Sequence, residues 1–94
     1  MSESQAEPTA EQLAEELRKA RVEDFIFQSG SLFASLAYGK LAADVNDLEQ
    51  ARLAIDALRA LVDVLPEEQR PTLQQTVANL QLAYAGAAAK PAAG

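Results

Sequence analysis

The 94-residue chain contains no cysteine and no histidine. Without cysteine it has no disulfide, thiol nucleophile or thiolate metal ligand, and without histidine it lacks the usual general base and the commonest metal ligand. Its net charge of −6 argues against direct nucleic acid binding, because that binding needs clustered Lys and Arg. We therefore expect neither an enzyme nor a metal or cofactor site.

The sequence also lacks a long apolar run. Residues 25–39 carry no charge, but they include a glutamine, three serines and two glycines. A spanning helix needs about 20 mainly apolar residues, so this run argues against a membrane segment. The first residues lack the basic and apolar regions of a signal peptide, and a cytoplasmic location is the resulting expectation.

Both ends of the chain are poor in core-forming side chains. Residues 1–9, MSESQAEPT, and residues 86–94, GAAAKPAAG, are small, polar or interrupted by proline and glycine. This composition predicts a disordered N-terminal arm and a disordered C-terminal tail. The helical domain is then expected to occupy residues 10–85.

The strongest helical pattern lies at residues 48–65, LEQARLAIDALRALVDVL. An apolar seam steps by three and four residues along it, which is typical of one buried helix face; its members are Leu48, Ala51, Ile55, Leu58, Val62 and Leu65. A second apolar stripe has similar spacing and consists of Leu53, Ala57, Ala60 and Val64. Because a surface helix needs only one such stripe, we expect another copy of the chain to cover the second.

Two further helical segments flank this central helix. Thr9 and Gln12 form a capping-box pattern before a charged lead-in, and an apolar segment follows over residues 22–43. A last helix begins between residues 67 and 72, with Pro71 in its first turn, and Gly86 is expected to end it. No stretch alternates as a strand does. The expected fold is all-α, a bundle of three helices completed by self-association.

The apolar segment is expected to pack through a seam that includes Val22, Phe33 and Leu36. Gly30, in its middle, indicates either close helix packing or a bend. Phe27 lies off the seam, so we predict that Phe27 and Leu53 anchor subunit contacts. The candidate interface residues are Phe25, Phe27, Gly30, Ser31, Ala34, Leu53, Ala57, Ala60 and Val64.

A charged ladder of alternating sign follows the central helix and consists of Glu49, Arg52, Asp56, Arg59 and Asp63. These carboxylates could in principle hold a metal, but the interleaved arginines favour salt bridges, within one chain or between chains. Serine nucleophiles would have to use Lys40 as their base. Close packing of small residues explains the same serines.

The run L-E-Q-A-R…I-D…L, from Leu48 to Leu58, resembles the bacterial family labelled domain of unknown function 1844. The similarity covers residues 24–84. It implies a small helical protein and transfers no catalytic residue, because the family has no established activity. Relatives in actinobacteria are often encoded near translation genes, which hints at a link with translation.

Two features depart from the family pattern. The longer connection between its first two helices is shortened here to ADVND, and the basic residues of its third helix are replaced by LQLAY at residues 80–84. The sequence therefore predicts a non-enzymatic, self-associating interaction module. The alternatives are an acidic adaptor for a basic protein partner, steered by charge, and a binder of a small apolar ligand between helices.

Overall fold

The computed structural model describes residues 9–89, and this part of the chain contains helices and no strand. The helices are α1 (Ala10–Lys19), α2 (Val22–Leu41), α3 (Leu48–Val64) and α4 (Arg70–Ala89), with the short 3₁₀ helix η2 (Glu67–Gln69) before α4. The all-α prediction is confirmed. The described residues hold four α-helices, however, because the charged lead-in forms a helix of its own.

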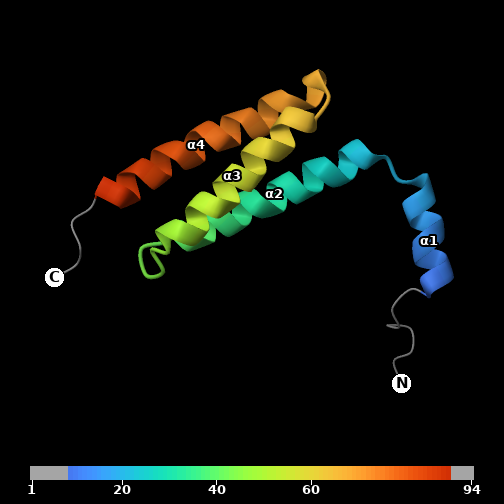
Figure 1. The fold of residues 1–94 in the computed structure, drawn as a ribbon, viewed down its shortest axis with the longest axis horizontal. Coiled ribbons are helices and arrows are strands. Elements are labelled where there is room, and N and C mark those ends of the chain that lie inside the picture. Colours follow the sequence, from blue (N-terminus) through green and yellow to red (C-terminus); the bar gives the residue numbers. More distant parts are fainter. Residues whose placement is uncertain (1–8, 90–94) are drawn as a thin grey trace.

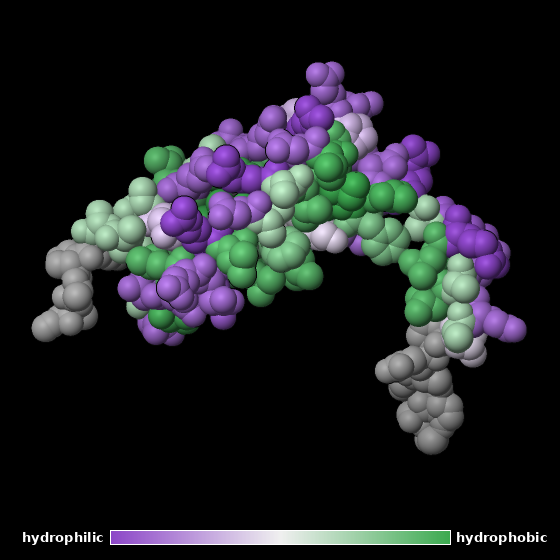
Figure 2. All heavy atoms as spheres, in the orientation of Figure 1, coloured by the Kyte–Doolittle hydropathy of each residue, from purple (hydrophilic) through white to green (hydrophobic). Residues whose placement is uncertain are grey.

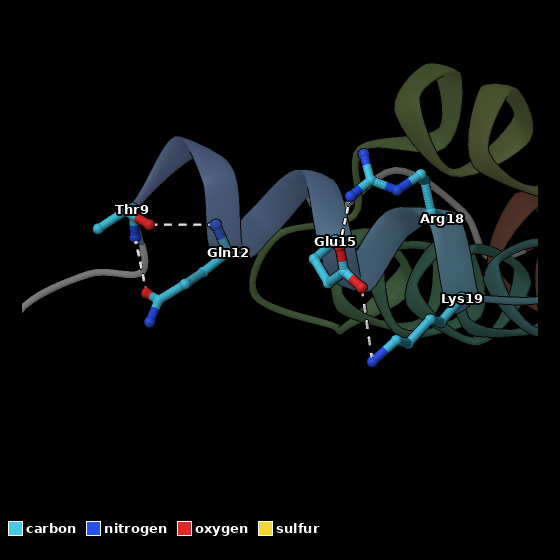
Figure 3. A network of polar contacts seen from close by, with 5 residues as sticks. All are labelled: Thr9, Gln12, Glu15, Arg18 and Lys19. Atoms are coloured by element: carbon cyan, nitrogen blue, oxygen red, sulfur yellow. Dashed lines mark hydrogen bonds and ion pairs between the residues drawn. The ribbon is translucent and has the colours of Figure 1, made fainter.

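Helix α1 begins at the predicted capping box. The backbone N–H of Gln12 donates to the Thr9 hydroxyl (3.1 Å), and the backbone N–H of Thr9 donates to the Gln12 side chain (3.0 Å). Glu15 pairs with both Arg18 and Lys19 one turn further on (Figure 3). No residue of α1 is buried, so the helix is solvated as the sequence predicts. In Figure 1 it points away from the other three helices.

The chain leaves the helical conformation between α1 and α2, at Ala20 and Arg21, where the backbone is extended. Arg21 then pairs with Glu23 (2.6 Å) in the first turn of α2. A hydrogen bond from its own backbone and the Arg21 guanidinium hold the pKa of the Glu23 carboxyl below its usual range. A bend near Gly30 was one expectation, but α2 is a single helix through that residue.

A short loop turns the chain from α2 into the antiparallel α3 (Figure 1). Asn46 takes a left-handed conformation (φ 47°), which asparagine tolerates better than most residues. The Asp47 backbone N–H donates to the Lys40 carbonyl (2.8 Å), and its carboxylate accepts from the Gln50 N–H (3.2 Å). Asp47 is therefore the N-cap of α3.

The joint between α3 and α4 is held by Arg70. Pro66 follows the end of α3, and Leu65 before it is already extended, as proline requires of the residue that precedes it. The Arg70 guanidinium donates to the carbonyls of Leu65 (2.8 Å) and Asp63 (3.2 Å) and so satisfies the last turn of α3. Helix α4 continues through Gly86 to Ala89, so the prediction that Gly86 ends it is wrong. Alanines on both sides favour the helix there.

The core lies where α2, α3 and α4 meet, and each of these helices contacts the other two. Leu58 of α3 and Leu80 of α4 are fully buried at its centre, and Leu65 and Leu73 are nearly so. The predicted seam of α3 is buried from Ala51 to Leu65. Helix α4 contributes Leu73 and Leu80, which are buried, and Val77 and Tyr84, which are partly buried against the core.

The predicted disordered N-terminal arm and C-terminal tail include residues 1–8 and 90–94, which lie outside the described residues.

Candidate interaction surface

The second apolar stripe of α3 lies on the surface. Leu53 and Val64 are each 63% exposed, Ala60 is also exposed, and Ala57 is half-buried. On an amphipathic helix this side would carry polar residues. The stripe is therefore unpartnered within the described chain.

The predicted interface residues of α2 divide between two sides of the helix. Phe25 and Ser31 are exposed. Gly30 and Ala34 are buried in the core of their own chain, and Phe27 is partly buried against that core. These three residues therefore contact the core of their own chain, and their assignment to a subunit contact stays a prediction.

The predicted core seam of α2 needs the opposite correction. Phe33 is partly buried against the core, as expected, but Val22 and Leu36 are exposed. The buried side is instead the one with the smallest residues, Gly30, Ala34 and Ala37. The charges of α2 lie only in its first and last turns, so no charged residue marks the outer side of its middle. The spacing of its bulky apolar residues alone therefore did not show which side faces inward.

Gly30 is the position where side chains of α3 and α4 lie against the backbone of α2. A Cβ atom at this position would lie 2.7 Å from Leu73 Cδ1 and 3.2 Å from Leu58 Cδ1. Of the two sequence interpretations, close packing is therefore confirmed. The packing is between helices of the same chain.

An apolar groove crosses the exposed side of α2 near its C-terminal end. It has a volume of about 320 Å³ and is lined by Leu32, Ser35, Leu36, Gly39 and Lys40 of α2 and Val45 of the loop. Figure 2 shows hydrophobic atoms along the edge formed by α2 in that view. This groove was not predicted from the sequence, although the spacing from Leu32 to Leu36 and Gly39 was a signal for it.

The charged ladder of α3 is solvent-exposed throughout. Among the ladder residues, only Asp56 and Arg59 come within ion-pair distance (3.9 Å). Together with α4 the ladder borders an open hollow of about 620 Å³, lined by Arg52, Asp56, Arg59, Ala60, Val62, Asp63, Gln74 and Val77. Because both signs of charge line this hollow, it is not the apolar cavity that a small apolar ligand would require.

Two observations bear on the sequence predictions about metal binding and catalysis. Residues 9–89 contain no group of three carboxylates placed to hold a metal ion. Ser35 and Lys40 border the same groove, and no hydrogen bond joins their side chains within residues 9–89. No helix within the described range is both long enough and apolar enough to cross a bilayer.

The geometry thus defines an all-α protein with apolar side chains on the outer sides of α2 and α3. No family model matches the chain, and neither the curated proteins nor the solved structures contain a match.

Proposed function

We propose that this protein is a non-enzymatic interaction module that self-associates through the exposed apolar sides of α2 and α3. One observation carries the proposal. Across residues 9–89, eleven large hydrophobic side chains are exposed, whereas the buried core holds only six that are larger than alanine. Exposed apolar area of this kind is typical of a contact surface.

The size of the core supports the same conclusion. Four of its ten buried hydrophobic residues are alanines, which contribute little buried area. A domain this small gains only a few kcal/mol from one hydrophobic core, and oligomerisation is a common source of additional stability. A three-helix bundle completed by a second copy would meet this need.

Sedimentation at micromolar concentration tests the proposal, with melting curves recorded at several protein concentrations. We expect a mass above 10 kDa and a midpoint that rises with concentration. Leu53→Asp should weaken association about 10-fold or more and leave the helical signal, whereas Ile55→Asp should unfold the chain. Leu82→Asp, an exposed leucine of α4, is the matched control. A monomer at all concentrations would refute the proposal.

Membership of the family labelled domain of unknown function 1844 stays a prediction that rests on the run from Leu48 to Leu58. A role as an acidic adaptor rests on the net charge of −6 alone. Retention on a column carrying immobilised polylysine that disappears in salt would be its first test, because charge-steered binding is screened by salt.

A further inference from the structure

The outer side of α2 carries an apolar stripe opposite its core side. Phe25, Leu32, Leu36 and Gly39 follow one another at intervals of seven, four and three residues, so they lie along one side of the helix. All four are exposed. The stripe spans fifteen residues, so its two ends lie about 21 Å apart along the helix.

The stripe has a bulky side chain at one end and open space at the other. Phe25 projects at the N-terminal end and is 46% exposed. A Cβ atom added at Gly39, at the other end, would meet nothing within 4 Å. The apolar groove lies beside Gly39, between Leu36 and Val45, so this end can accept a bulky side chain.

The positions of Phe25 and Gly39 suit a two-fold pairing, because each lies seven residues from Leu32. If two copies of α2 pack antiparallel with the axis at Leu32, Phe25 of each copy lies opposite Gly39 of the other. A parallel pairing would instead place the two Phe25 side chains together. It would also leave a gap between the two Gly39 residues.

The charges of α2 favour the same direction. Glu23 and Asp24 occupy its first turn, Lys40 occupies its last turn, and no charged residue lies between them. Antiparallel packing brings the acidic end of one helix near the basic end of the other, whereas parallel packing brings like charges together. Asp24 and Lys40 form no ion pair within residues 9–89, so both are available to a second copy.

We propose that a second copy of this chain docks on the outer side of α2, antiparallel and centred on Leu32, with Phe25 of each copy beside Gly39 of the other. The inference rests on the proposed self-association and adds its face, direction and register.

Disulfide trapping tests this arrangement directly, because the natural chain has no cysteine to interfere. Leu32→Cys should form a covalent dimer under mild oxidation. Phe25→Cys and Gly39→Cys should each stay uncrosslinked alone, since their own copies lie about 21 Å apart, and should form a covalent heterodimer when mixed. Leu82→Cys, on α4, is the control for random collision. Circular dichroism checks that each variant remains helical.

The outcomes separate this inference from the proposed function. A wild type that sediments as a monomer overturns both. An oligomer in which Leu32→Cys does not crosslink overturns the docking face and leaves self-association standing. Crosslinking of Phe25→Cys with itself, and none in the mixture, shows a parallel pairing and overturns the proposed direction.

A variant with a larger side chain at Gly39 tests the proposed contact independently. Gly39→Leu fills the space that Phe25 of the second copy would enter, so the dissociation constant should rise about 10-fold or more. Gly86→Leu, at the other helical glycine with open space around it, should leave the constant unchanged. A Gly39→Leu variant that dimerises as tightly as the wild type would overturn the proposed contact.

Discussion

Replacing Gly30 by alanine sets two opposing effects against each other. In a helix interior, alanine is favoured over glycine by about 1 kcal/mol, so helix propensity alone predicts a more stable protein. The new Cβ atom, however, would lie 2.7 Å from Leu73 Cδ1 and 3.2 Å from Leu58 Cδ1. Both leucines are buried in the core, Leu58 completely, so moving their methyl groups disturbs the side chains packed around them.

The steric effect should win. Adding a methyl group to a tightly packed core costs about 1–3 kcal/mol, which exceeds the gain in propensity. We therefore expect Gly30→Ala to lower the free energy of unfolding by about 1 kcal/mol. For a domain of this size the melting midpoint should then fall by about 4–8 °C.

Gly86→Ala is the matched control, because the same methyl group there meets no atom within 4 Å. It should raise the free energy of unfolding by up to about 1 kcal/mol, less any loss to fraying near the end of α4. Urea unfolding followed by circular dichroism, at one fixed protein concentration, measures both changes. If Gly30→Ala stabilises the chain as much as Gly86→Ala does, the close approach of the three helices at Gly30 is wrong.

Three further changes probe other parts of the fold. Leu58→Ala removes a fully buried side chain and should lower the free energy of unfolding by about 2–5 kcal/mol. That loss should leave much of the variant unfolded at room temperature, and urea titrations would measure it. Arg70→Ala removes two charged hydrogen bonds to the end of α3 and should cost about 1.5 kcal/mol; full stability in this variant would show that water replaces the guanidinium. The stabilisation from ionised Glu23 is complete above its unfolded-state pKa of about 4.3 and is lost as the pH falls through its lowered folded-state pKa. Below about pH 4.3 the wild type should therefore lose more stability than Glu23→Gln. If the two proteins lose helicity over the same pH range in acid titrations, this prediction is wrong.

Features that depend on neighbouring residues could be predicted from the sequence. The caps at Thr9 and Asp47, the stop before Pro66 and the buried seam around Leu58 all follow from short-range patterns, and all appear in the structure. The seam could be predicted because α3 alternates apolar and charged residues, so its inward side is marked. On α4 uncharged polar residues such as Gln74 and Gln81, beside Leu73 and Leu80, mark the outer side instead.

The break between α1 and α2 was missed because no glycine or proline marks it. The signal was electrostatic. Basic residues occupy the last turn of α1 (Arg18, Lys19), and acidic residues occupy the first turn of α2 (Glu23, Asp24). Each pair complements the partial charge at its helix end, and this arrangement is typical of one helix ending and another beginning. At Gly86 the opposite error occurred: a helix end was predicted where the helix continues. Glycine does not end a helix when the surrounding residues are strong helix formers.

The orientation of α2 could not be predicted from its own residues, and the reason bears on function. Its middle has no charge, so the apolar pattern has no preferred side. The choice depends on α3 and α4, which supply the large leucines Leu58 and Leu73, and these fit only against a side of α2 made of small residues. Burying that side leaves the bulky residues of α2, among them Phe25 and Leu32, on the outside. The packing that completes the core is thus also what exposes the apolar stripe, and a second copy can then bury it.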